Sequence, residues 1–538
     1  MKSLIRWTTT AAFAALLGVG CTETEIQFVD REPFNPPPDA AAGYLGYYTP
    51  GTKQTTCGNC HAGGQGAWAQ TRHAGAWVTL QNSGSAQPFC AGCHNVSELG
   101  NAVDSAAGYN KVADSAYFDV QCESCHGPGL NHVVSVSAGS VVRPWASVAV
   151  DTVGTNGCAG CHEGTHHPFV EQWSASKHGY GADHYVSYGG RSPCNQCHEG
   201  RTAMRLQFGE NASYVESDSA NFQPMMCATC HDPHSATNEG QLRAPLGEPS
   251  RNQLCVKCHS REGHPEPGSA TRRGPHAAQG LLVIDEDVGW IPPNFQYDAT
   301  KIVGSHGTAA NTRLCASCHV YKFDVNDAAT GDFLLTSVGH TFEAIQCLDA
   351  TGVPVPGPCA LTERQFGGCA VSGCHTSVDG ARSAFVSARS RMNFLTDQLW
   401  TDDGDAVLEP TDGGALPRVL VQAIAANNLN EINLYDNVLT PAEGAIWNAQ
   451  LAYTSERTYW SGFTVQGQKS CTPTATCTTQ GSSNTAHKSS GEGTHNPFLL
   501  EALLISSIQY LQSFYGLPAP PAQLQAQMTV PPGVRRVK

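Results

Sequence analysis

The sequence predicts a mostly irregular and α-helical fold with little β structure, in which short helices and loops wrap around bound groups and a C-terminal helical region caps them. Three observations predict this fold class. The 538 residues include 55 Gly and 32 Pro, which favour short turns. A cysteine pair followed at once by histidine recurs nine times between residues 57 and 375. An apolar period typical of helices becomes clear only after residue 375.

The first 52 residues have the character of a leader and a tether. Lys2 and Arg6 precede a short apolar run, which predicts a secretory signal peptide over residues 1–20. Cys21 follows directly and resembles the lipobox cysteine of bacterial lipoproteins, with cleavage without lipidation as the alternative. Residues 21–52 are Pro-rich and have no period, so we expect a lipid-anchored, extended tether.

The nine motifs occupy residues 53–376, which we predict to form one cofactor-binding domain. Eight have two residues between the cysteines, and the ninth has four. The motifs, numbered 1 to 9 in chain order, are Cys57/Cys60/His61, Cys90/Cys93/His94, Cys122/Cys125/His126, Cys158/Cys161/His162, Cys194/Cys197/His198, Cys227/Cys230/His231, Cys255/Cys258/His259, Cys315/Cys318/His319 and Cys369/Cys374/His375.

A Cys-x-x-Cys-His run is the attachment signature of haem c. The two thiols become thioethers to the macrocycle, and the adjacent imidazole ligates the iron as its proximal ligand. Structural zinc is a poor alternative, because it needs no histidine after every cysteine pair. The cofactor prediction is therefore nine haem c groups and a multihaem cytochrome. The wide spacer of motif 9 leaves a disulfide pair as an alternative there.

The close spacing of the motifs predicts an array of neighbouring haems. Successive motifs begin between 28 and 60 residues apart, so little protein separates one haem from the next. Haems that lie close together exchange electrons by tunnelling. We therefore interpret the array as a wire.

Thirteen of the 22 histidines lie outside the motifs, enough for a second axial ligand to each iron. The unit Trp-x-x-Ser/Thr-x-His occurs twice, and other histidines follow closely after a motif; the alternative for the Trp units is a core Trp beside an exposed His. Of the neighbours His166 and His167, we expect one ligand and one structural residue. We expect His184 and His264 not to be ligands. The candidate distal ligands are His73, His132, His167, His178, His234, His276, His306, His340 and His495.

The C-terminal region, residues 377–517, has the pattern of helices that pack on the haems. One apolar face runs from Ala384 to Leu399, and a second helix begins at Thr440-Pro441 with a capping box. A third helix begins at Asn496-Pro497 and ends near Gly516. An independent partner-binding domain is the alternative. We expect residues 518–538 to form a flexible tail.

Four cysteines remain beyond the motifs and Cys21. They form two local pairs, Cys347/Cys359 and Cys471/Cys477, which are candidate disulfides in an exported protein. Free thiols are the alternative.

The Trp-x-x-Ser/Thr-x-His units, the Cys-His-Gly-Pro-Gly and Cys-His-Asp-Pro-His runs and His495-Asn496-Pro497 resemble multihaem c-type cytochromes of metal-reducing and other anaerobically respiring bacteria. The resemblance covers residues 57 to 515. It implies low-spin haems with two histidine ligands, and electron transfer. With the leader at residues 1–20, we expect export to the periplasm, outer membrane or cell surface of a Gram-negative bacterium.

Two other functions stay open at this stage. A reductase of nitrite, hydroxylamine or a sulfur oxyanion needs an iron with an open distal position; the Cys-x-x-Cys-Lys site found in nitrite-reductase relatives is absent from this sequence. A filament-forming cytochrome subunit is the third possibility.

The net charge of −15 makes nucleic acid an improbable partner. We expect redox-partner cytochromes or a quinol-linked donor, with an extracellular metal as a possible acceptor. Contact with the membrane would come through an acylated Cys21.

Overall fold

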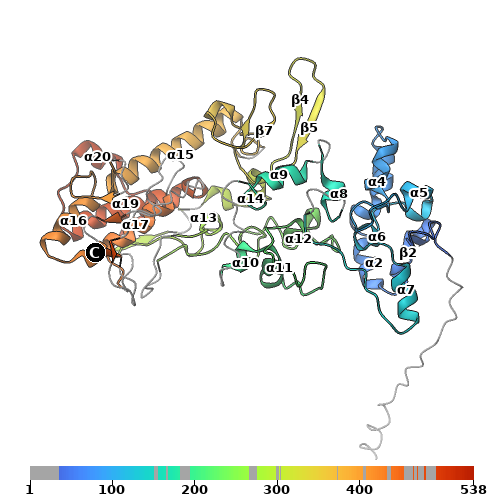
Figure 1. Cartoon of the computed structure of the whole chain (residues 1–538). Coiled ribbons are helices and arrows are strands. Elements are labelled where there is room, and N and C mark those ends of the chain that lie inside the picture. The colour runs from blue at the N-terminus through green and yellow to red at the C-terminus, as the bar shows by residue number, and fades with distance from the viewer. Residues whose placement is uncertain are drawn as a thin grey trace, which may run out of the picture.

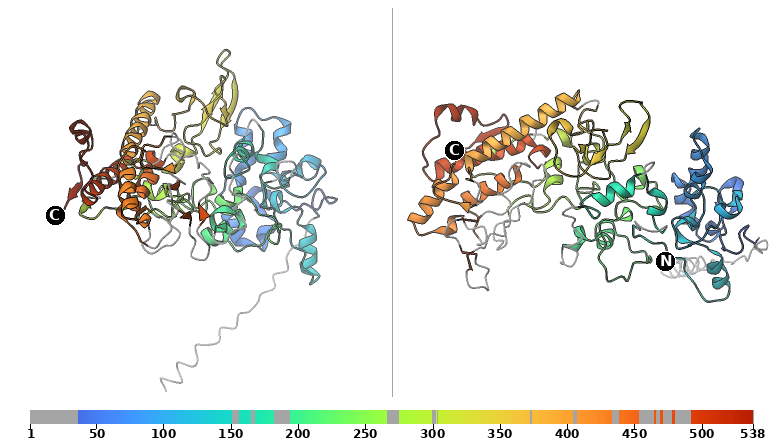
Figure 2. Two further views of the ribbon diagram at one scale, coloured as in Figure 1. Left: turned by 60° about the vertical axis from the view of Figure 1, so that its left-hand side comes forward. Right: turned by 45° about the horizontal axis from the view of Figure 1, so that its top comes forward.

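The computed structural model describes residues 36–150, 156–164, 168–181, 194–265, 275–298, 302, 304–371, 374–403, 407–432, 438–452, 464–465, 469–470, 478–479 and 492–537. The molecule is elongated, and the chain progresses from an N-terminal lobe at one end to a helical bundle at the other (Figure 1). The turned views in Figure 2 show the same order of parts.

The N-terminal lobe contains motifs 1 to 3 and a small core around two tyrosines. The Tyr44 and Tyr117 side chains are fully buried, and the Tyr117 hydroxyl donates to the Tyr44 carbonyl at 2.8 Å. The lobe is built from β1 (Tyr47–Thr49), η1 (Pro50–Thr52), β2 (Gln54–Thr55), η2 (Cys57–Asn59), α2 (Ala62–Trp68), η3 (His73–Gly75), α3 (Ala76–Asn82), η4 (Pro88–Cys90), α4 (Ala91–His94), α5 (Tyr109–Val112), η5 (Ser115–Tyr117), α6 (Cys122–His126) and α7 (Leu130–Ser137).

This lobe corrects the predicted tether over residues 21–52. Asp39, Tyr44, Leu45 and Tyr47 are buried, and β1 pairs with β2. The prediction was wrong for residues 39–52 because aromatic side chains of this segment pack into the core of the lobe. The prolines and the absence of a period in the sequence do not indicate this packing. Residues 1–35, with the expected signal peptide and Cys21, lie outside the described part.

The central part holds motifs 4 to 9 on short helices joined by irregular chain, with the β4–β5 hairpin projecting from it (Figures 1 and 2). Its elements are α8 (Ala159–His162), α9 (Phe169–Ala175), α10 (Asn195–His198), α11 (Gly200–Phe208), α12 (Cys227–Cys230), η7 (Glu239–Gln241), α13 (Gln279–Ile284), β3 (Phe295–Tyr297), η8 (Ser305–Gly307), α14 (Cys315–His319), β4 (Phe323–Asn326), β5 (Phe333–Ser337), β6 (Cys347–Leu348), β7 (Pro354–Val355) and η9 (Leu361–Glu363).

The C-terminal region is the largest apolar core among the described residues. Helix α17 is buried on all sides, and it packs against α15 and α19. The predicted capping box is present, because Glu443 accepts from the Thr440 N–H at 3.1 Å and donates its own N–H to the Thr440 hydroxyl at 3.2 Å. The elements are α15 (Val378–Leu399), β8 (Val407–Leu408), α16 (Leu416–Ala425), η10 (Leu429–Ile432), α17 (Pro441–Ala452), β9 (Thr464–Val465), β10 (Lys469–Ser470), β11 (Thr478–Thr479), α18 (Glu492–His495) and α19 (Pro497–Phe514).

The predicted flexible tail, residues 518–538, is ordered up to residue 537. It forms α20 (Ala522–Gln527) and β12 (Val534–Arg536), and β12 pairs antiparallel with β3. Arg391 on α15 also donates to the Gln527 carbonyl at 2.7 Å. The prediction was wrong because a distant strand supplies the partner of the tail, and composition does not show such a partner.

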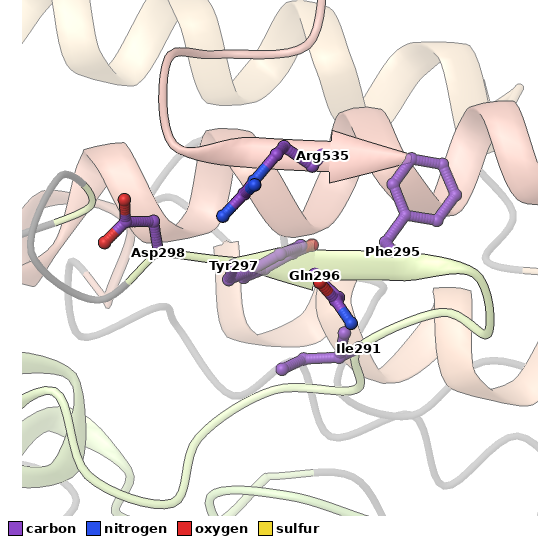
Figure 3. A pocket seen from close by; sticks show the side chains of 6 residues that line it. All are labelled: Ile291, Phe295, Gln296, Tyr297, Asp298 and Arg535. Carbon is purple, nitrogen blue, oxygen red and sulfur yellow. The ribbon is translucent and has the colours of Figure 1, made fainter. Parts of the chain in front are cut away.

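Strands are short, as the sequence predicts. Every sheet in the described part has two strands. No described helix combines the length and the apolar character needed to cross a bilayer. A cavity of about 350 Å³ lies beside the β3–β12 pair, lined by Phe295, Tyr297, Asp298 and Arg535 among others (Figure 3). It has no cysteine or histidine in its lining, so it is separate from the motif residues.

Candidate haem-binding array

Each motif folds as one turn of chain that gathers its three functional side chains. In motif 1 the His61 N–H donates to the Cys57 carbonyl at 2.9 Å, and motifs 4 to 7 repeat this bond at 2.9 to 3.0 Å. Residues one turn apart share a face of a helix, so both thiols and the imidazole lie on one side.

Motif 9 reaches the same backbone contact with two extra residues. The His375 N–H donates to the Cys369 carbonyl at 3.2 Å. The histidine of motif 9 therefore makes the same backbone contact with its first cysteine as in motifs 1 and 4 to 7.

None of the eighteen motif cysteines forms a disulfide. Cys347 and Cys359, by contrast, form the predicted disulfide, with Cα atoms 5.9 Å apart. The pair Cys471/Cys477 lies outside the described residues. The motif cysteines thus remain available for thioether bonds, whereas Cys347 and Cys359 form a crosslink.

The second cysteine of three motifs lies at the protein surface. Cys60, Cys125 and Cys374 are exposed, whereas the other fifteen motif cysteines are partly buried.

Eight motif histidines face a second histidine at a nearly constant distance. Their ring centres are 6.0 to 6.4 Å apart. Two imidazoles that coordinate one metal from opposite sides would have ring centres about 6 Å apart, because each metal–nitrogen bond is about 2 Å and the nitrogen is about 1 Å from the ring centre. The pairs are His61–His132, His162–His73, His126–His234, His259–His178, His198–His276, His231–His340, His375–His306 and His319–His495.

The second histidine always comes from another part of the chain. His132 follows motif 3 but faces motif 1, and His234 follows motif 6 but faces motif 3. His495, at the end of α18, stacks parallel to His319 with an interplanar angle of 3°. These pairs therefore connect segments that are distant in sequence.

Motif 2 is the remaining case. The Nδ1 atom of His94 lies 3.1 Å from the Ala76 carbonyl. The candidate distal ligand His167 lies outside the described residues, as do His166, His184 and His487.

Backbone carbonyls orient several of the imidazoles. The Nδ1 atoms of His126, His231 and His319 lie 2.7 to 2.8 Å from the carbonyls of Pro144, Gly240 and Phe342. A proton on Nδ1, donated to a carbonyl, leaves the lone pair of Nε2 for a metal. Among the second histidines, His132 makes the same contact with the Val142 carbonyl at 2.7 Å.

Burial favours the neutral form, the form that binds metal, of several paired imidazoles. Burial lowers the pKa of His178 to about 3 and that of His340 to about 4. Burial also lowers the pKa of His73, His259 and His319.

The two Trp-containing repeats build equivalent turns. Trp68 and Trp173 are buried, and their indole N–H groups donate to the carbonyls of Val120 at 2.9 Å and Met225 at 2.7 Å. The Thr71 hydroxyl donates to the Trp68 carbonyl at 2.8 Å, and Ser176 does the same to Trp173 at 2.6 Å. The Trp is thus part of the core, and the turn that it fixes leads to a paired histidine.

His264, predicted not to be a ligand, lies 3.1 Å from a carboxylate oxygen of Asp287. Sequence reasoning missed the aromatic residues that pack on the imidazoles. Phe342 is edge-on to His178, with ring centres 4.6 Å apart, and Phe169 is edge-on to His340 at 4.9 Å. Single phenylalanines carry no pattern from which this packing could be predicted.

Comparisons with known proteins give matches to haem-binding families. The family model "Doubled CXXCH motif" matches residues 220–264, and "Cytochrome c554 and c-prime" matches residues 56–127. The first covers motifs 6 and 7, and the second covers motifs 1 to 3.

Two characterised relatives are similar over about a third of the chain. "Multiheme cytochrome MtrA" of Shewanella baltica is 25% identical over 191 residues, which are 33% of this chain and 54% of the relative. "C-type polyheme cytochrome OmcC" of Geobacter sulfurreducens is 26% identical over 209 residues, 32% of this chain and 26% of the relative. The chain thus spans about half of the first relative and about a quarter of the second.

Among solved structures, an "Undecaheme cytochrome from S-layer of Carboxydothermus ferrireducens" aligns over 91% of this chain and 71% of its own. The sequence identity is 16% and the TM-score is 0.42, too low for the arrangements of the two chains to be compared further.

Proposed function

Because this chain is a multihaem c-type cytochrome, we propose that it relays electrons along nine haems, each held by a motif and ligated by histidine on both faces. The observation that carries the proposal is the eight histidine pairs with ring centres 6.0 to 6.4 Å apart. When bound, each haem supplies an iron that gains or loses one electron.

The residues of the chain divide into three roles. The motif cysteines attach each macrocycle, and the motif histidines bind from the proximal side. The second histidines of the eight pairs bind from the distal side, and we assign His167 to motif 2. The carbonyls of Pro144, Gly240 and Phe342 fix the orientation of three proximal rings.

Two histidines per iron favour an electron carrier over a reductase. A small oxidant has to displace a ligand to reach an iron that is held on both faces. Eight of the nine motifs have a paired histidine at a suitable distance, which supports transfer without substrate binding.

The C-terminal region contributes a ligand and, we propose, a cap over motif 8. His495 reaches His319 from α18, and the Asn496 side chain donates to the Leu282 carbonyl at 3.1 Å. The Trp447 indole donates to the Gly263 carbonyl at 3.0 Å. These contacts favour a cap over an independent domain.

The proposal includes a place in the cell and partners. We propose export by the signal peptide and anchoring by an acylated Cys21 at the periplasm or outer membrane of a Gram-negative bacterium. The electrons would come from a quinol-linked donor or a partner cytochrome in anaerobic respiration. They would pass to another cytochrome or to an extracellular metal, which the net charge of −15 would attract as a cation.

A reductive titration of the purified holoprotein tests the proposal. We expect uptake of nine electrons per chain, one for each motif, and their full return to a ferric complex. Addition of nitrite or hydroxylamine to the reduced protein should give no catalytic turnover. Fast turnover of either oxidant, or an uptake of a single electron, would contradict the proposal.

A further inference from the structure

Phe342 lies against candidate ligands of three different motifs. Its ring is edge-on to His178, the second histidine of motif 7, with ring centres 4.6 Å apart and an interplanar angle of 78°. The ring centre of His340, the second histidine of motif 6, is 5.4 Å away. The Phe342 carbonyl oxygen lies 2.8 Å from Nδ1 of His319 in motif 8. A single residue is therefore in position to orient three imidazoles.

The backbone of Phe342 has a conformation that a bulky residue rarely adopts. Its φ is +56°, in the left-handed region, where the Cβ atom crowds the carbonyl. The Phe342 N–H donates to the Gly339 carbonyl at 3.2 Å and closes a tight turn. A Cβ atom on Gly339 would lie 2.6 Å from the carbonyl carbon of Val320, the residue after His319. The turn thus approaches motif 8 closely, and the strained backbone directs attention to a functional constraint at Phe342.

Helix α9 holds the segment that contains this turn. The Gln172 side chain on α9 accepts the His340 N–H at 3.0 Å and donates to the Ser337 hydroxyl at 3.1 Å. Both Gln172 and Ser337 are buried. The chain continues from the end of α9 to His178 within three residues. The segments that carry Phe342 and His178 are therefore fixed to each other beside their ring contact.

The imidazole that Phe342 contacts most closely belongs to the most nearly perpendicular histidine pair. The rings of His178 and His259 have an interplanar angle of 73°, whereas the other seven pairs have angles of 3° to 60°. An edge-on aromatic contact favours one orientation of the contacted ring. The Phe342 ring consequently opposes a rotation of His178 toward the plane of His259.

We propose that Phe342 is a positioning residue that holds His178 nearly perpendicular to His259 and thereby tunes the haem of motif 7. The inference rests on the proposed function, in which these two histidines ligate one iron. Parallel imidazole planes separate two iron d orbitals in energy and stabilise the ferric ion, whereas perpendicular planes leave the two orbitals nearly equal. The haem of motif 7 therefore has a higher midpoint potential than it would have with parallel rings.

Electron paramagnetic resonance of the oxidised holoprotein detects this arrangement. A low-spin ferric haem with nearly perpendicular imidazoles has a larger maximum g value than one with parallel imidazoles. We expect the holoprotein to show such a large-g signal. His178→Ala should convert it to a high-spin signal, which assigns the large-g signal to motif 7.

Three variants of Phe342 separate the effect of its ring from that of its carbonyl. Phe342→Leu removes the flat ring and keeps most of the side-chain volume. Phe342→Gly also removes the ring, but glycine adopts a positive φ readily and should keep the carbonyl beside His319. Both variants should move the large-g signal of motif 7 to a smaller g value and lower its midpoint potential in a redox titration followed by the same spectroscopy.

Phe342→Tyr retains an aromatic ring and should keep the large-g signal of the parent. Phe333→Leu is the matched control, because Phe333 lies on β5 of the adjoining hairpin and is 52% exposed. It should leave the signal and the potential unchanged. Intact mass shows that every variant carries the same number of haems as the parent.

The outcomes distinguish this inference from the proposed function. Absence of a large-g signal from an entirely low-spin parent would overturn the positioning role, and so would a signal that stays unchanged in Phe342→Leu and Phe342→Gly. Equal changes in Phe342→Tyr or Phe333→Leu would show a general disturbance and overturn it too. High-spin haem in the parent would instead contradict the proposed ligation by two histidines. If Phe342→Gly fails to mature, Phe342→Leu decides the question.

Discussion

The role of a histidine as an iron ligand can be tested by replacing that one residue. His340 faces His231 with ring centres 6.4 Å apart, and burial holds its pKa at about 4, so it is neutral. His264 has a carboxylate partner, Asp287, at 3.1 Å. The two residues are therefore a matched pair of a proposed ligand and a structural histidine.

Replacement of His340 by Ala should convert one low-spin haem to high spin, because the iron loses its distal ligand. Electron paramagnetic resonance of the oxidised protein measures the change. The control His264→Ala should keep the spectrum of the parent. A high-spin signal in the control, or none in His340→Ala, would remove the assignment.

Glu123 shows how a motif is tied to its surroundings. Glu123 lies between the two cysteines of motif 3 in the sequence and is 2% exposed, and its carboxylate accepts the N–H groups of Leu45, Gly46 and Gly129 at 2.7 to 2.8 Å. Burial raises its pKa to about 7, although the three backbone donors act in the opposite direction.

Glu123→Gln should lower the free energy of unfolding by roughly 1–3 kcal/mol, because the amide group cannot accept all of these bonds. Thermal unfolding measures this loss, with the exposed Glu239→Gln as control. The folded carboxyl binds its proton more tightly than the unfolded one, so its contribution is greatest below pH 4.5 and declines as the pH rises to 7. The variant should lack this part of the pH dependence; an unchanged slope would contradict the assignment.

The identity of the motif residues was the most predictable part of the site. The residues that each of them contacts were the least predictable part. The motif cysteines and histidines can be predicted from their spacing alone, because haem attachment requires two cysteines followed directly by a histidine. Spacing does not show that Cys60 and Cys374 lie at the surface, because exposure depends on which motifs pack together. The pairing of His126 with His234, and the packing of Phe342 on His178, likewise depend on how distant segments fold back.

At the scale of elements, capping chemistry predicted the helices well. Asn496 accepts from the Leu499 N–H at 3.1 Å at the start of α19, and Thr440 begins α17 as expected. Helix α16 was missed, although it buries Leu416, Val419 and Leu420. The tail and the end of the tether were wrong because strand partners and small aromatic cores are not local properties.

Asn448 links α17 to the central part of the molecule. Its side chain accepts the Trp290 N–H at 2.7 Å, and donates to the Trp290 carbonyl at 2.7 Å and to the Ser507 hydroxyl at 2.9 Å. Asn448 and Ser507 are fully buried, and Trp290 is partly buried.

Asn448→Ala should destabilise the C-terminal region by about 2–3 kcal/mol, because it leaves the partly buried N–H and carbonyl groups of Trp290 without this partner. The melting of helical circular dichroism measures the effect. Arg418→Ala, at an exposed position on α16, is the control and should change little. Equal stability of Asn448→Ala and the control would show that these bonds contribute nothing to the packing of α17.

At the scale of the whole molecule, the haem array and the C-terminal helical core are continuous. The pairs His162–His73 and His126–His234 join the N-terminal lobe to the central part, and His319–His495 joins motif 8 to the C-terminal region. In Figure 1 the helices that contain motifs, from α4 to α14, lie between the N-terminal end and the middle of the molecule, and the C-terminal helices α15 to α20 form the other end. The sequence predicted an array, but its connections follow from contacts between motifs.

The central claim is that histidine ligates every iron on both faces. Electron paramagnetic resonance of the fully oxidised holoprotein tests it most directly, with the haem number taken from intact mass. We expect only low-spin signals, which integrate to one spin for each haem after allowance for coupling between neighbours. An axial high-spin signal equal to one or more haems would contradict the claim and indicate an iron open to substrate.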